Sequence, residues 1–178
     1  NGRTFFALRH GTEIAAGFGQ GVRIRNTFTP RALEDYGFKT ILNISAAVSS
    51  GNGEARTISA GLFSAEPSGT GLQATGIYFM RRYIDGSVDD WKLVCSNAGT
   101  STTVDLGTKP AGADMLLEFR ITGAGTSVQA YINNDAVGSP ITTNLPPTTT
   151  LMVPAVHSAE STPVQTPPDL NACYGLGM

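Results

Sequence analysis

The sequence predicts an all-β fold in which two antiparallel sheets pack together as a β-sandwich or jelly roll. Short segments rich in β-branched and aromatic residues recur through the whole chain, and turn residues separate them every eight to twelve positions or so. The 21 glycines and 10 prolines among 178 residues supply those turns. The length fits one domain, which we expect to cover residues 1–178.

Eleven segments have the composition or the period-two alternation of strands. In chain order they are 5–9, 22–28, 40–48, 57–63, 76–83, 91–96, 102–106, 115–122, 127–132, 151–157 and 172–176. Helix-start chemistry occurs only at 29–36, where Thr29 is a candidate N-cap and Pro30 would take the first helical position. We expect one or two helical turns there at most.

The segment 115–122 illustrates the alternation. Leu117, Phe119 and Ile121 fall on one side of an extended chain, and Glu118 and Arg120 fall on the other. One face of this strand is therefore predicted to lie in the core and the other in solvent.

Two turn signals follow that strand. The run 123–126 joins it to 127–132, and Asn133-Asn134-Asp135 turns the chain again before 136–138. These segments predict a three-strand meander.

Three other segments are expected to be extended and unpaired. The N-terminal residues 1–21 are rich in Gly and Ala and resemble an arm that a partner orders. The loops 140–150 and 161–168 are rich in Thr and Pro, which favour extended backbone.

Charge excludes some partners. The chain has 12 Lys and Arg against 14 Asp and Glu, a formal net charge of −2, and it has no basic block. We therefore expect no nucleic-acid partner and no charge-driven membrane binding. A run of about 20 apolar residues, which a membrane-spanning helix needs, is also missing from the sequence.

The potential metal ligands are scattered. Cys95, Cys173, His10 and His157 stand far apart in the sequence, without CxxC, HxxxH or HExxH spacing. The two cysteines are best interpreted as small buried apolar residues. A disulfide between Cys95 and Cys173 is the alternative, which the sequence does not decide. The acidic and amide clusters at Asp85, Asp89-Asp90 and Asn133-Asn134-Asp135 fit turns better than calcium sites. We predict neither a metal nor a cofactor.

Catalytic patterns are also missing. No strand places two carboxylates on one face in the manner of a glycoside hydrolase, although the sequence leaves open that acids from different strands meet in space. The chain has no GxSxG elbow, and no GK[ST] follows its glycine clusters at 17–21 and 51–53. The sequence therefore favours a protein that is not an enzyme.

Aromatic side chains are the remaining candidates for a binding surface. One interpretation is that these rings are exposed and either stack on a glycan or anchor a protein partner. The candidates are Tyr78, Tyr83, Trp91, Tyr131 and Tyr174. In the alternative interpretation, Trp91 and Tyr131 simply fill the sandwich.

The second half of the chain resembles a known family. The segments that carry the resemblance are 91–94, 102–106, 117–121, 128–138 and 142–146, in which an aromatic strand ending in Asn133-Asn134 precedes a Thr-x-Asn-Leu-Pro loop. They look like concanavalin A-like lectin/glucanase sandwiches in structural proteins of tailed phages. Asn134 stands where that family usually has Gly, and Asn tolerates the left-handed conformation.

The resemblance covers about residues 76–176 and implies a virion component. Such a component would be a capsid decoration, cement or head-fibre protein that forms homo-oligomers and binds other virion proteins. A tail or baseplate adhesin that recognises host surface glycans is the alternative. The acidic calcium loop of the lectins and the ExDxxE strand of the glucanases are both missing, so the resemblance transfers no functional residue.

Overall fold

The computed structural model describes residues 6–9, 20–23, 36–44, 55–84, 87–88, 90–107, 114–160 and 170–177. These residues contain strands, turns and coil but no helix. The strands are β1 (Phe6–Arg9), β2 (Gln20–Arg23), β3 (Tyr36–Ile44), β4 (Ala55–Phe63), β5 (Gly76–Ile84), β6 (Ser87–Val88), β7 (Lys92–Asn97), β8 (Thr100–Asp105), β9 (Asp114–Thr122), β10 (Ser127–Ile132), β11 (Asp135–Ile141), β12 (Val153–Glu160) and β13 (Leu170–Gly177).

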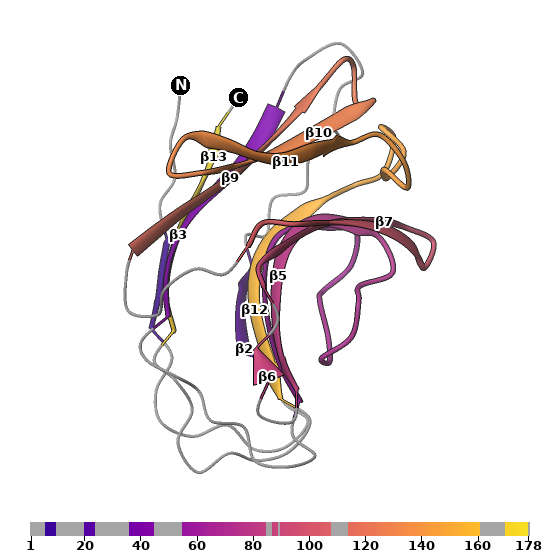
Figure 1. Cartoon of the computed structure of the whole chain (residues 1–178). Helices are drawn as coiled ribbons and strands as arrows, with labels where there is room; N and C mark the ends of the chain where they lie inside the picture. Colours follow the sequence, from indigo (N-terminus) through magenta and orange to yellow (C-terminus); the bar gives the residue numbers. More distant parts are fainter. Residues whose placement is uncertain are drawn as a thin grey trace.

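The strands form two antiparallel sheets that face each other (Figure 1). Sheet A has the order β1-β13-β3-β9-β10-β11. Sheet B has the order β2-β12-β4-β5-β7-β8, and the short β6 pairs with β5. The prediction of a two-sheet antiparallel β-sandwich is confirmed.

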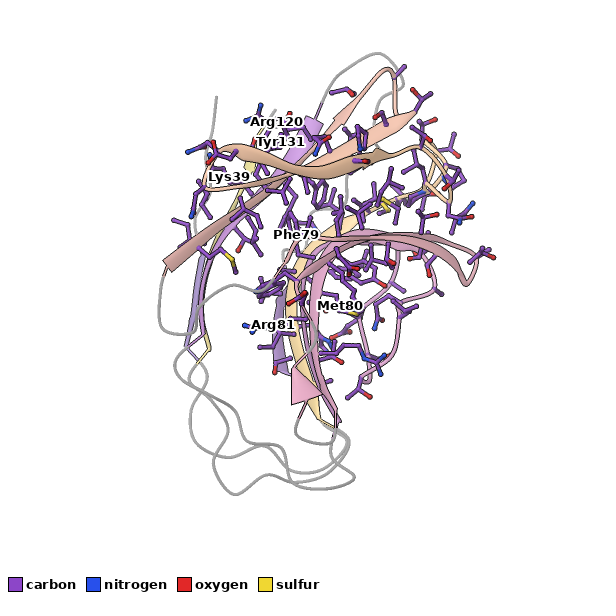
Figure 2. All side chains as sticks on the ribbon, in the orientation of Figure 1. Lys39, Phe79, Met80, Arg81, Arg120 and Tyr131 are labelled. Atoms are coloured by element: carbon purple, nitrogen blue, oxygen red, sulfur yellow. The ribbon has the colours of Figure 1, made fainter. Side chains whose placement is uncertain are left out.

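The inner faces of the two sheets enclose the main core. Phe38 of β3 stacks on Phe119 of β9 with ring centroids 5.6 Å apart, and Phe79 of β5 lies 5.7 Å from Phe119 across the sandwich. Figure 2 shows Phe79 between the sheets and Met80, its neighbour in sequence, on the opposite side of sheet B. This alternation means that each long strand has one core-facing side.

The predicted meander is β9-β10-β11. Leu117, Phe119 and Ile121 are buried as expected, and Arg120 is exposed. Asn133 and Asn134 have φ angles of 53° and 74°, the left-handed values that a two-residue hairpin turn requires. Asn134 therefore adopts the left-handed conformation that the sequence analysis expected it to tolerate.

The edges of the two sheets are joined beside β11. Thr102 of β8 forms a 2.7 Å hydrogen bond with Thr143, and Asn144 Nδ2 donates to Thr102 Oγ1 at 2.9 Å. Leu145 packs against the core. The Thr-x-Asn-Leu-Pro segment therefore fastens sheet A to sheet B within the chain.

Some expected boundaries differ. Tyr36 begins β3 and is not the end of a helix, and the rest of the predicted helix lies outside the described residues. Within the expected arm, β1 pairs with β13 and β2 pairs with β12. Pro140 belongs to β11, an edge strand, where its missing N–H group is tolerated. The loop 161–168 is outside the described part of the chain.

Candidate functional site

A row of charged and aromatic side chains crosses the outer face of sheet A, the face turned away from sheet B. Lys39 of β3, Glu118 of β9 and Tyr131 of β10 are direct partners in the strand register. Lys39 Nζ lies 3.3 Å from Glu118 Oε2, and Arg120 Nε donates to Glu118 Oε1 at 2.6 Å. The Arg120 guanidinium lies 4.0 Å from the centroid of the Tyr131 ring.

We call Lys39, Glu118, Arg120 and Tyr131 the sheet A row; Figure 2 labels its two cations and Tyr131 on the same side of the molecule. Glu118 holds the row together because it contacts both cations. Its partial burial would raise its pKa, but the hydrogen bonds from Arg120 and Lys39 outweigh that effect and lower it. The carboxylate is therefore charged at neutral pH, and Ile41, which is 41% exposed, adds apolar area on the same face.

Removing the Glu118 charge should change the acid dependence of stability. A lowered pKa in the folded state contributes stability above the ordinary glutamate pKa, and this contribution is lost as the pH falls through the folded value. Because both cations are half exposed, we expect Glu118→Gln to lower the free energy of unfolding at pH 7 by about 1 kcal/mol or less. The difference from the wild type should shrink in urea titrations at acidic pH.

The matched control is Asp105→Asn. Asp105 is 72% exposed and lies 3.9 Å from Lys92, so its ion pair is expected to contribute little. If Glu118→Gln and the wild type had the same stability at every pH, the sheet A row would not be an energetically coupled unit.

The outer face of sheet B carries a second, smaller core. Phe63, Tyr78, Met80, Val94 and Ala155 form a separate buried cluster there, and the Phe63 and Tyr78 rings stack 5.0 Å apart. A sheet face that looked onto solvent would not bury these side chains. Some other part of the chain must cover it.

Residues 64–75, which connect β4 to β5, provide that cover, and we call them the strap. In Figure 1 this magenta segment lies on the side of sheet B that faces away from sheet A. Thr57 Oγ1 donates to the Thr70 carbonyl at 2.6 Å, and Gln73 N–H donates to the Tyr78 hydroxyl at 2.9 Å. Gly99 N–H donates to the Ala74 carbonyl at 2.8 Å. The strap is thus fastened to β4, β5 and the β7–β8 turn.

Three polar side chains of this face contain buried atoms that lack a hydrogen-bond partner among the described residues. They are Ser59 Oγ on β4, Arg82 Nε on β5 and His157 Nδ1 on β12. Ser59 and His157 are 1% and 4% exposed. Leaving such a group unpaired costs about 1–3 kcal/mol, so these positions need an explanation.

Two opposing effects act on the pKa of His157. Burial lowers the pKa of the imidazole, whereas the negative charge of Glu66 on the strap acts in the opposite direction. We call Ser59, Arg82 and His157 the covered polar cluster. The cluster comes from β4, β5 and β12, and no sequence motif indicates it.

The aromatic residues predicted to form a binding surface differ in their burial and position. Trp91 and Tyr78 are both 0% exposed, so the prediction of an exposed ring is wrong for Tyr78, and for Trp91 the alternative interpretation, that it fills the sandwich, is confirmed. Trp91 lies in the main core and Tyr78 under the strap, because alternation turns each ring toward an apolar layer. Tyr131 is half-buried in the sheet A row. The side chains of Tyr83 and Tyr174 are outside the described residues.

The described residues contain few groups suited to metals or catalysis. Cys95 is free and buried, and burial raises the pKa of its thiol to about 12. Among the described side chains, no three His, Cys, Asp or Glu converge to hold a metal ion. None of the described residues forms a helix that could cross a membrane.

Carboxylates are sparse on sheet B. Among the strand residues whose side chains are described on its outer face, Asp105 is the one acid, and it stands at the edge on β8. Glu66 approaches the face from the strap. The described strand residues on the outer face of sheet B therefore do not assemble the close pair of carboxylates that glycoside hydrolysis needs.

The comparisons with known proteins concern the fold. No protein-family model matches the chain, and no curated protein matches it in sequence. Among solved structures, the Emp46p carbohydrate recognition domain in its potassium-bound form superimposes with a TM-score of 0.64 at 7% identity, covering 98% of this chain and 87% of that one. The chain has the concanavalin A-like sandwich fold.

Enzymes share this fold. A Bacillus licheniformis β-glucanase superimposes with a TM-score of 0.55 at 10% identity, covering 89% of this chain and 71% of the enzyme. The alginate lyase AlyC3 gives a TM-score of 0.56 at 9% identity, covering 96% of this chain and 73% of that one. At these identities the likeness establishes architecture, and function must be argued from the surface of this chain.

Proposed function

We propose that the chain is a non-enzymatic structural component of a tailed-phage particle, a capsid decoration, cement or head-fibre protein that binds neighbouring subunits and forms homo-oligomers. The observation that favours this proposal is the closure of sheet B by the strap. Because the strap covers the buried cluster on the outer face of sheet B, contact with other molecules falls to the outer face of sheet A and to the sheet edges.

The sheet A row suits a protein contact. Glu118 fixes Lys39 and Arg120 in position, and Arg120 in turn lies over Tyr131. Side chains that are already ordered lose little conformational entropy on binding, and Tyr and Arg are enriched among the residues that dominate interfaces. Ile41 adds exposed apolar area beside them.

The test is quantitative mass spectrometry of particles purified from a lysate of the phage that encodes this chain. We expect a constant copy number per particle that survives density-gradient separation and a high-salt wash. A non-structural phage enzyme from the same lysate is the control and should disappear during purification. Recovery of the chain only in the soluble fraction would contradict the structural role.

Carbohydrate binding is the second candidate. The half-buried Tyr131 ring on a sheet face is a surface on which a sugar can stack, and a carbohydrate recognition domain has the same fold. An array of bacterial surface polysaccharides, probed with the wild type and Tyr131→Ala, separates the candidates. Binding that Tyr131→Ala abolishes and Gln129→Ala preserves would favour the adhesin. Silence of the wild type across the array would count against it.

A further inference from the structure

The covered polar cluster has a donor chemistry that the chain itself leaves unused. An Arg Nε–H group and a Ser hydroxyl donate hydrogen bonds, and an imidazole donates from Nδ1 when that atom is protonated. All three atoms are buried without a partner among the described residues. A group of donors that converges on one place is matched by a ligand that only accepts hydrogen bonds.

The strand register brings the three residues together. Ser59 in the middle of β4 is the direct partner of His157 on β12 and of Met80 on β5. Arg82 is two residues beyond Met80 and is therefore on the same face, opposite Thr57. Direct partners have Cβ atoms about 5 Å apart and diagonal ones about 7–8 Å apart, so a long guanidinium side chain spans the remaining gap.

The hydroxyl of Thr57 does not take part, because it already donates to the strap at Thr70. The same bond places Thr70 of the strap at Thr57, which pairs with Arg82 on β5 and lies two residues before Ser59 on the same face of β4. The strap also brings in Glu66, whose negative charge acts on His157.

We propose that the covered polar cluster is a binding site for a small monocarboxylate anion. The inference concerns this chain's own ligand and is independent of the virion role. Arg82 supplies the permanent positive charge, and Ser59 and His157 supply hydrogen bonds. One added anion balances the charge of Arg82, and the negative charge of Glu66 on the strap opposes its binding.

Ser59 provides a discriminating variant. If Ser59 is only an uncompensated buried hydroxyl, Ser59→Ala would improve stability and change nothing else. If it binds an anion, Ser59→Ala weakens acetate binding by about tenfold, the effect of one lost charge-assisted hydrogen bond. In both cases the protein remains folded, because the substitution removes a single oxygen atom.

Acetate is the probe, and the imidazole resonances of the full chain provide the signal. The chain has two histidines, so His10→Gln assigns the His157 resonances. We expect a saturable shift of the His157 signals on titration with sodium acetate. Glu66→Gln should bind acetate about threefold more tightly, which is the scale of one exposed charge interaction. The matched control Asp105→Asn removes a carboxylate at the far edge of the same sheet and should leave the affinity unchanged.

Other salts distinguish a site from a salt effect. Sodium chloride should give no saturable shift, and inorganic phosphate should bind more weakly than acetate because its second charge is not balanced. The proposal is overturned if acetate gives no saturable shift in either the wild type or Glu66→Gln. Equal shifts with chloride, or unchanged acetate affinity in Ser59→Ala and Arg82→Gln, would overturn it as well.

Discussion

Trp91→Ala is expected to lower the free energy of unfolding by about 3–5 kcal/mol, the range for a large aromatic side chain removed from a core. Trp91 is 0% exposed and belongs to the cluster between the sheets. The Trp91 carbonyl also accepts the Leu106 N–H bond at 2.7 Å, so the residue lies where β7 begins and β8 ends. Urea unfolding followed by far-ultraviolet circular dichroism measures the change.

Trp91→Phe is the matched variant. It keeps a buried aromatic ring and removes the indole N–H group, which has no hydrogen-bond partner among the described residues. We expect it to lose clearly less stability than the alanine variant. Trp91 is the only tryptophan, so tryptophan fluorescence reports on it alone. Because its ring is buried, wild-type fluorescence should be blue-shifted and resistant to acrylamide quenching. Ready quenching in the native protein would place the ring at the surface and contradict the structure.

Gly61→Ala is expected to lower the free energy of unfolding by about 3 kcal/mol, at the upper end of the range for overpacking. Gly61 pairs with Tyr78 in the centre of sheet B. A methyl group at Gly61 would lie 2.5 Å from both Cα and Cβ of Tyr78, whereas carbon atoms pack best about 3.5–4.0 Å apart. It would also meet the Ile77 carbonyl oxygen, so backbone would have to move.

Gly71→Ala controls for the general effect of replacing glycine. A methyl group at Gly71 on the strap meets no atom within 4 Å. Its stability should therefore stay within about 0.5 kcal/mol of the wild type, with a slight gain from the stiffer unfolded chain. Equal effects of the two substitutions in thermal and urea unfolding would show that the contact at Gly61 is not decisive.

The sequence was sufficient to predict the sandwich because alternation is a local property. The pattern Leu117, Phe119, Ile121 marks a core-facing side without any knowledge of the partner strands, and the Asn133-Asn134 turn is chosen by local backbone conformation. The resemblance to the concanavalin A-like family correctly indicated the fold. The phage origin that it implied remains a proposal.

The surfaces were harder to predict. Trp91 and Tyr78 have the residue types of a binding site, yet alternation alone does not say that a loop covers the outer face of sheet B. The covered polar cluster depends on register between β4, β5 and β12, and β12 begins 90 residues after β4 ends. Pairing over that distance is set by the whole topology, so a reading of single segments misses it.

The strap is also a natural place to graft new sequence. It joins β4 and β5, adjacent strands whose register runs unbroken from the Phe63–Gly76 pair to the Ala55–Ile84 pair, so extra residues at its tip would leave strand pairing intact. Residues 68, 69, 71 and 72 are exposed, and doubling the length of a flexible connection costs only about 0.6 kcal/mol. An epitope inserted between Gly71 and Leu72 would leave the bond from Thr57 to the Thr70 carbonyl in place, and the Thr102–Thr143 hydrogen bond lies outside the strap.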